Sequence, residues 1–220
     1  MLPFMSETKL LRVNEIFDSI EGEGKRAGSL VTFIRLTGCN LRCSYCDTQY
    51  AFNEGELFAV SKIAEQVKRH KVTITGGEPL MQDNLRFLLD ALHGHDVNIE
   101  TNGSVDIEPF FHYPQVFFTV DYKCYTSCMS SAMLSKNFDI LRKRDVLKFV
   151  VGSTIDLEQA RRFYIKHYNV LRNRIIYVSP VFGQIEPVKI VEYIKENKLY
   201  NWRVQIQLHK IIWPPDMRGV

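Results

Sequence analysis

Short apolar runs alternate with amphipathic segments along the whole chain. Seven of these runs are rich in Val, Ile and Phe and show little polar alternation, which is typical of strands buried on both faces. They cover residues 31–36, 72–75, 97–100, 116–120, 146–151, 175–178 and 204–208. Strands separated by helical segments predict an α/β fold with mostly parallel strands, arranged as an open sheet or a barrel.

Three helices can be predicted between these runs. Leucines at 85, 88, 89 and 92 fall on one helical stripe. Asp156 and Gln159 have the spacing of a capping box, which predicts a helix opening there and continuing through Tyr168. Pro187 suits the first turn of a helix that carries apolar residues at 190, 191 and 194.

The composition limits the classes of protein to which the chain can belong. A chain of 220 residues with 45% hydrophobic and 24% charged residues, without low-complexity segments, predicts a single globular domain over 1–220. A net charge of +3 without a clustered basic stripe argues against a nucleic-acid partner. No run reaches the length of a membrane span, and residues 1–5 lack the pattern of a signal peptide, so we expect no membrane association and a reducing cytoplasmic location.

Three cysteines carry the strongest chemical signal. Cys39, Cys43 and Cys46 form a C-x3-C-x2-C run directly after the first buried strand. Three thiolates can hold three irons of a 4Fe–4S cubane and leave the fourth iron open, whereas clusters that only transfer electrons take four cysteines. Zinc is disfavoured because it needs four ligands, and the odd cysteine count argues against a disulfide framework. We expect Cys124 and Cys128 to be structural thiols.

A glycine-rich motif follows the second buried strand. Gly76 and Gly77 precede Glu78 and Pro79, and paired glycines let the backbone approach a ligand closely. In (βα) barrels the chemistry lies on loops at the carboxyl ends of strands, where both this motif and the cysteine run fall. No G-x-G-x-x-G follows a strand, which disfavours a dinucleotide fold.

Together these motifs resemble the radical S-adenosylmethionine (SAM) superfamily, whose cysteine run carries an aromatic residue before its last cysteine, here Tyr45. The resemblance implies a partial (βα) barrel in which the open iron binds SAM and the glycine-rich motif contacts its amino group. An external one-electron reductant then cleaves SAM to a 5′-deoxyadenosyl radical that abstracts hydrogen.

A narrower resemblance covers nearly the whole chain. Segments 15–17, 20–24, 33–39, 46–48 and 205–210 are similar to the 7-carboxy-7-deazaguanine synthase family. The resemblance implies conversion of 6-carboxy-5,6,7,8-tetrahydropterin to 7-carboxy-7-deazaguanine with loss of ammonia, a step toward queuosine. It also implies a requirement for Mg²⁺ and a homodimer.

The family resemblance assigns roles residue by residue. Arg35 would grip the pterin carboxylate, Thr48 would bind Mg²⁺, and Glu21 stands where the family has Gln, although a carboxylate cannot donate as an amide does. The family's Ser-Pro-Lys segment falls on Asp121, Tyr122 and Lys123, of which only Lys is kept. The expected substrate contacts are Ile20, Glu21, Gly22, Glu23, Arg35, Thr75 and His209. The expected SAM contacts are Tyr45, Cys46, Asp47, Gly76, Gly77, Glu78, Asn102, Asp121, Tyr122, Lys123, Ser179, Pro180, Val181 and Phe182.

Two alternatives stay open at the level of sequence. A glycyl-radical activating enzyme shares the cysteine run but has no use for segment 21–24 or Arg35. An iron–sulfur electron carrier needs a fourth cysteine, for which Cys124 and Cys128 are the candidates. Some relatives end soon after the pair corresponding to 209–210, and their terminal carboxylate reaches the active site; this chain continues to Val220.

Overall fold

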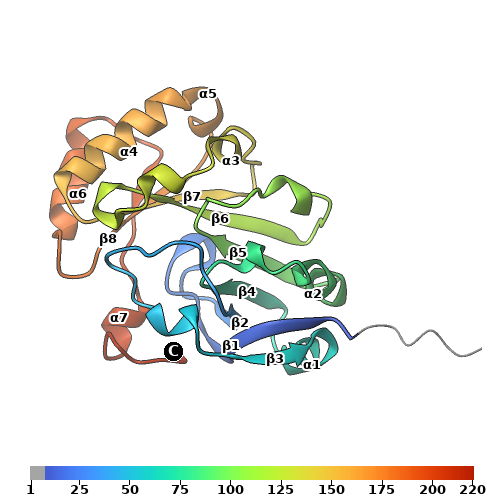
Figure 1. Ribbon diagram of the computed structural model, residues 1–220. Coiled ribbons are helices and arrows are strands. Elements are labelled where there is room, and N and C mark those ends of the chain that lie inside the picture. The colour runs from blue at the N-terminus through green and yellow to red at the C-terminus, as the bar shows by residue number, and fades with distance from the viewer. Residues whose placement is uncertain (1–7) are drawn as a thin grey trace, which may run out of the picture.

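The computed structural model describes residues 8–220, which fold around a single sheet of nine strands (Figure 1). The strand order is β3-β1-β2-β4-β5-β6-β7-β8-β9, and every neighbouring pair from β2 to β9 is parallel. The edge strands β3 and β9 do not pair with each other, so the sheet is the open, partial (βα) barrel that the sequence predicts. The strands are β1 (Leu10–Ile20), β2 (Leu30–Leu36), β3 (Glu56–Ala59), β4 (Lys71–Gly76), β5 (Asp96–Thr101), β6 (Val116–Lys123), β7 (Val146–Val151), β8 (Ile176–Pro180) and β9 (Trp202–Val204).

The main apolar core lies between the sheet and the helices that connect its strands. It includes the predicted leucine stripe: Leu85, Leu88 and Leu89 lie on α2, Leu92 directly follows it, and all four are fully buried. Side chains alternate between the two faces of each strand, so the face turned away from this core is free to carry polar groups. The helices are α1 (Val60–Gln66), α2 (Leu85–Ala91), α3 (Ser135–Asp139), α4 (Thr154–Lys166), α5 (Tyr168–Leu171), α6 (Pro187–Glu196) and α7 (His209–Ile212).

The start of the sheet differs from the sequence prediction. β1 is an eleven-residue strand that pairs antiparallel with both β2 and β3. It mixes charged and apolar residues and is buried only in part, so it gives no continuous apolar run from which a buried strand could be predicted.

The predicted capping box at Asp156 and Gln159 is wrong. The N-cap of α4 is Ser153, whose hydroxyl accepts from the Asp156 amide at 3.3 Å. The Asp156 carboxylate instead accepts from the backbone amides of Gly152 and Thr126, at 2.7 and 2.9 Å. The helix ends at Lys166, and Tyr168 opens the short α5.

The strand predicted at 204–208 is also wrong, because β9 ends at Val204. Beyond it, Gln205 accepts from the Gly24 amide at 2.7 Å, and Gln207 reaches Glu23 at 3.4 Å. These contacts draw the chain off the sheet and toward the residues that follow β1.

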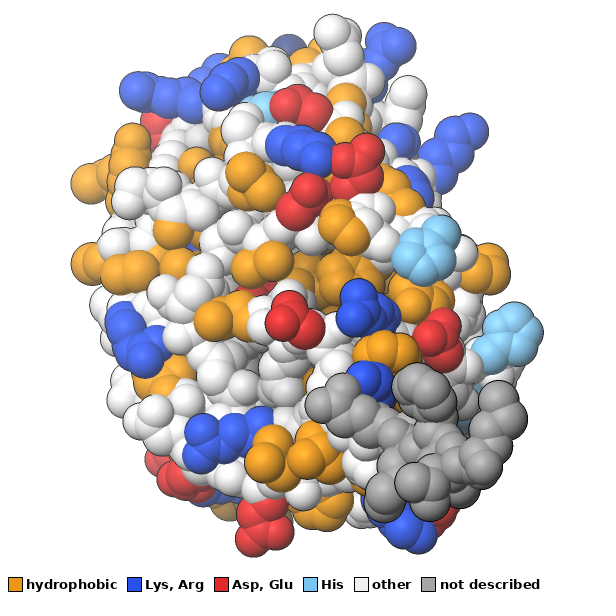
Figure 2. All heavy atoms as spheres, turned by 45° about the vertical axis from the view of Figure 1, so that its right-hand side comes forward, with side chains coloured by type: hydrophobic (Ala, Val, Ile, Leu, Met, Phe, Trp, Pro, Cys, Tyr) orange, Lys and Arg blue, Asp and Glu red, His pale blue; other side chains and the backbone are white. Residues whose placement is uncertain are grey.

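Charge is dispersed over one face of the molecule. On the face shown in Figure 2, Lys and Arg side chains are interspersed with acidic and hydrophobic ones. Within residues 8–220, no helix has the length and apolar character required to cross a membrane. The expectation about a signal peptide concerns residues 1–5, which lie outside the described residues.

Candidate functional site

A cavity of about 290 Å³ opens at the carboxyl ends of the parallel strands. The cysteine loop, the segment after β1 and the C-terminal residues 215–220 complete its wall. Of the residues predicted for cluster, SAM, metal and substrate, all but Glu78, Tyr122 and Ser179 line this cavity. The structure therefore brings together in one place residues that span most of the sequence.

The three cysteines lie in the loop after β2. Cys39, Cys43 and Cys46 are all half-buried, and burial raises the pKa of the Cys39 and Cys43 thiols. The Leu41 amide donates to Cys39 Sγ at 3.4 Å. Arg42 lies over the Phe52 ring, 4.2 Å from its centroid, which holds the loop against the following turn. The cysteine loop thus presents three partly shielded sulfurs to one cavity.

These residues fit a cubane cluster better than a single ion. Across residues 8–220, no three His, Cys, Asp or Glu side chains are arranged to hold one metal ion. A cubane does not need ligands that converge on one point, because each of three irons takes one thiolate. Iron would also stabilise the thiolate forms that burial disfavours.

The paired glycines allow β4 to approach the cysteine loop. Gly76 has φ of +137°, and a Cβ on Gly77 would collide with the Gly38 carbonyl. The Gly77 amide donates to Leu36 O at 3.1 Å, and the Glu78 amide donates to Gly38 O at 2.7 Å. The glycines therefore serve first to fasten the two loops to each other, and a residue with a side chain would separate them.

Glu78 supports the site from behind the cavity. Its carboxylate accepts from the amides of Leu80 and Asn102, at 3.1 and 2.7 Å, and from the hydroxyl of Thr101 at 2.9 and 3.0 Å. Burial raises its pKa to about 7. In this position Glu78 fixes Asn102, which does line the cavity and whose Nδ2 lies 3.8 Å from Cys39 Sγ.

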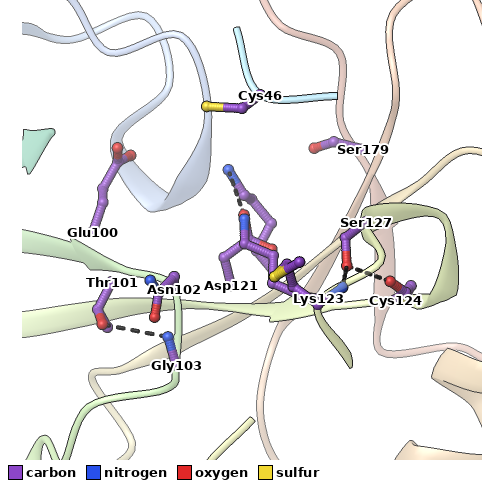
Figure 3. Close-up of polar contacts among 12 residues, drawn as sticks. Cys46, Glu100, Thr101, Asn102, Gly103, Asp121, Lys123, Cys124, Ser127 and Ser179 are labelled. Atoms are coloured by element: carbon purple, nitrogen blue, oxygen red, sulfur yellow. Dashed lines mark hydrogen bonds and ion pairs between the residues drawn. The ribbon is translucent and has the colours of Figure 1, made fainter. Parts of the chain in front are cut away.

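Strand alternation separates the three residues at the end of β6. Asp121 and Lys123 form an ion pair at 2.9 Å that rises into the space between Cys46, Glu100 and Ser179 (Figure 3). The side chain of Tyr122 points to the opposite face, where it packs against Phe138 and contacts Gln159 through its hydroxyl. Only the backbone of Tyr122 is therefore placed to contact SAM.

Ser179 does not itself line the cavity, although its side chain points toward it (Figure 3). Its hydroxyl donates to Glu23 Oε1 at 2.6 Å, while Pro180, Val181 and Phe182, which follow it, line the cavity.

Arg35 projects from β2 on the face opposite the core. Its Nε donates to Glu15 Oε1 at 2.6 Å, and its guanidinium lies about 6 Å from the ring centroids of Phe17 and Tyr50. No hydrogen bond from its two terminal nitrogens is found within residues 8–220. This leaves the end of the guanidinium fork available for a carboxylate.

The Glu21 side chain is buried and its carboxylate is hydrogen-bonded within the protein. It is only 2% exposed and accepts from Arg26 at 2.9 Å, from Thr73 at 3.0 Å and from Asn98 at 3.0 Å. Burial raises its pKa, and the Arg26 guanidinium opposes that shift. Arg26 thus explains how this chain accommodates a buried carboxylate at the position where the family resemblance implies an amide.

The next residues of that segment meet the C-terminal part of the chain. A Cβ on Gly22 would collide with the His209 ring, and the Leu208 amide donates to Gly22 O at 3.2 Å. Burial lowers the pKa of His209. Lys210 donates to Asp47 Oδ2 at 2.7 Å, which holds α7 against the cysteine loop.

Thr48 carries a hydroxyl at the cavity wall. Although it precedes the helical turn Gln49–Phe52, its side chain makes no capping hydrogen bond. The hydroxyl lies 3.7 Å from Cys46 Sγ. It is therefore placed between the cysteine loop and the rest of the cavity.

Sequence reasoning missed several residues of the cavity wall, among them Tyr50, Glu100, Lys148 and residues 215–220. Lys148 did carry a signal, because it is the one charged residue within the apolar run 146–151. By contrast, Cys124 is fully buried and Cys128 is exposed, and neither lines the cavity.

The chain is similar to known proteins over most of its length. The profile of the Radical SAM superfamily matches residues 33–125. The 7-carboxy-7-deazaguanine synthase of Clostridium acetobutylicum is 46% identical, over 95% of this chain and 99% of that protein. That of Chlorobaculum tepidum is 37% identical, over 98% of this chain and all of that protein. The crystal structure of QueE from Escherichia coli superposes with a TM-score of 0.71 at 25% identity, covering 90% of this chain and 94% of that one.

Proposed function

The chain belongs to the 7-carboxy-7-deazaguanine synthase family of the radical SAM superfamily, and from this premise we propose how its cavity performs that reaction. The substrate would be 6-carboxy-5,6,7,8-tetrahydropterin and the products 7-carboxy-7-deazaguanine and ammonia. The observation that carries the proposal is one cavity in which the three cysteines and the free end of the Arg35 guanidinium face the same space. A glycyl-radical activase or an electron carrier has no need for such an arginine.

The cofactors are assigned to the half of the cavity nearest the cysteine loop. Cys39, Cys43 and Cys46 would hold a 4Fe–4S cluster, and the backbone of 76–77 together with Asn102 and the Asp121–Lys123 pair would hold SAM. When bound, cluster and SAM supply a carbon radical that removes one hydrogen atom from the substrate. The work of the protein is to place that hydrogen within reach and to exclude water.

The pterin is assigned to the other half. Arg35 would pair with its carboxylate, since the Nε–Glu15 contact fixes the guanidinium and leaves the fork free. Glu23, Thr75 and His209 would bind the ring, and the Gly22 backbone approaches closely enough to contribute. Glu21 would act through the position of its backbone, because its carboxylate is occupied.

We further propose that Mg²⁺ assists by way of Thr48. A hydroxyl is a legitimate Mg²⁺ ligand when substrate oxygens and waters fill the remaining positions. The support is that this hydroxyl lines the cavity and is not used as a helix cap. A homodimer and a cytoplasmic location remain part of the same proposal.

Anaerobic turnover tests the proposed function. Protein with a reconstituted cluster, supplied with SAM, Mg²⁺ and dithionite, should convert the carboxypterin to a deazapurine of the expected mass and release ammonia. Cys43→Ala treated in the same way should give neither product. A wild-type protein that cleaves SAM yet leaves the carboxypterin unchanged would refute the assignment.

A further inference from the structure

Lys148 is a largely buried cation on the cavity wall, and the proposed function assigns it no role. It sits on β7, directly opposite Asp121 of β6 in the strand register. Its side chain is only 12% exposed, and its Nζ lies 3.2 Å from Glu23 Oε2 and 3.8 Å from Asp121 Oδ2. Lysine is rarely buried to this degree unless it is paired.

These contacts join the two halves of the cavity. Glu23 follows β1 in the half assigned to the pterin, whereas Asp121, paired with Lys123 at 2.9 Å, lies beside the cysteine loop. Glu23, Lys148, Asp121 and Lys123 therefore form a row of alternating charges from one half to the other. The row is made entirely of side chains that line the cavity.

Stability alone gives a weak reason for such a row. Desolvating charges costs roughly as much as their mutual attraction returns, so an apolar residue would serve the sheet as well. The neighbours of Lys148 along β7, Leu147 and Phe149, are fully buried and apolar.

We propose that Lys148 is a positioning residue that keeps Glu23 ionised and oriented toward the pterin and ties it to the SAM half of the cavity. This rests on the proposed function. Glu23 has two further partners, Ser179 at 2.6 Å and Gln207 at 3.4 Å, and neither carries a charge. Among residues 8–220, Lys148 is thus the cation in direct contact with that carboxylate.

The charged surroundings agree with this role. Burial would raise the pKa of Glu23, but Lys148 together with Ser179 and Gln207 lowers it below its ordinary value. Burial would lower the pKa of Lys148, but Glu23, Asp121 and Glu100 raise it, against the opposing charge of Lys123. Tyr45, Asp47 and His209 also lie within the electrostatic reach of Lys148. Removing Lys148 would therefore leave Glu23 buried without a direct counter-charge.

The test compares Lys148→Met and Lys148→Gln with Lys148→Arg, and uses Lys143→Met, an exposed lysine just before β7, as the matched control. At pH 7 both uncharged variants should lower kcat/KM for the carboxypterin by about tenfold to a hundredfold, with SAM affinity near wild type. The acid limb of their pH–rate profile should move to higher pH, because Glu23 now binds a proton more readily. The variants should also release more 5′-deoxyadenosine per deazapurine formed. Lys148→Arg should restore the acid limb to its wild-type position, and Lys143→Met should leave both kcat/KM and the pH–rate profile unchanged.

Two results would overturn the inference. One is a wild-type pH–rate profile in Lys148→Met or Lys148→Gln. The other is a loss of kcat/KM that is equal at every pH and that Lys148→Arg does not relieve, because such a loss marks a purely structural role. Both leave the proposed function standing if the wild-type protein forms the deazapurine. If the wild-type protein forms no deazapurine, both the proposed function and this inference are refuted.

Discussion

Arg218 lies over the ring of Tyr50, with 3.7 Å between the guanidinium carbon and the ring centroid. The Tyr50 hydroxyl donates to Glu15 at 3.1 Å, and Glu15 in turn accepts from Arg35. Figure 1 shows the C-terminus and α7 beside the helical turn that carries Tyr50. The last residues of the chain are thus connected, through two side chains, to the arginine assigned to the substrate carboxylate.

This connection predicts that Arg218→Ala weakens binding of the carboxypterin. Its ion pair with Glu54 is solvent-exposed and contributes little, so the effect should come from the contact with the ring. A cation–π contact at an exposed site, worth about 0.5–1 kcal/mol, corresponds to a rise in KM of roughly twofold to fivefold. Titrating pterin and SAM separately checks this, with Lys195→Ala on α6 as control. An unchanged KM for the pterin would separate the C-terminus from substrate binding.

Arg35→Ala should be more damaging. It removes a charge-assisted contact of roughly 1.5–3 kcal/mol, so carboxypterin binding should weaken by about tenfold to a hundredfold while SAM affinity stays near wild type. Arg35→Lys should recover only part of the loss, because an ammonium cannot form the two parallel bonds of a guanidinium. Equilibrium binding to the reconstituted protein measures both ligands. Undiminished pterin affinity in Arg35→Ala would remove this residue from the site.

The cysteines divide into two groups with different expected phenotypes. Alanine at Cys39, Cys43 or Cys46 should abolish the SAM-responsive cluster, since each thiolate would hold one iron. Alanine at Cys124 or Cys128 should leave iron and sulfide content unchanged, because neither lines the cavity. Iron and sulfide analysis after anaerobic reconstitution distinguishes the groups. A complete cluster in Cys43→Ala would contradict the assignment.

Turnover should depend on Mg²⁺ through Thr48. Thr48→Ala should lower the rate and raise the Mg²⁺ concentration required, with the cluster intact, whereas Thr48→Ser keeps the oxygen and should retain more activity. The rate is measured against Mg²⁺ for the three proteins after chelator treatment. If the wild-type protein runs at full rate without a divalent ion, both the metal and the role of Thr48 are excluded.

The fold could be predicted from sequence wherever a local pattern had a single physical reading. Apolar runs such as 146–151 gave strands and the leucine stripe gave α2, because burial dictates both patterns. β1 was not predicted because it mixes charged and apolar residues and is only partly buried, so it forms no continuous apolar run. The strand expected at 204–208 failed because Gln205 and Gln207 bind residues that follow β1, which no local pattern can reveal.

The candidate site divides in the same way. Motif spacing located the cysteine loop and the glycines, but it could not say that Glu78 supports the cavity from behind, that Ser179 binds Glu23, or that Tyr122 faces the core. Those orientations depend on strand alternation and on partners such as Asn102 and Glu23. Residues 215–220 carry no motif, and only the folded chain brings them to the cavity.

The transfer of hydrogen from pterin to SAM tests the central claim most directly, because it requires both molecules to lie in the one cavity. Reconstituted protein would be given carboxypterin deuterated on its saturated ring carbons, together with unlabelled SAM, Mg²⁺ and dithionite, and the SAM-derived nucleoside would be analysed by mass spectrometry. We predict that deuterium appears in that nucleoside in step with deazapurine formation. Deazapurine formed with no deuterium in the nucleoside, or SAM cleaved with the pterin unchanged, would contradict the account.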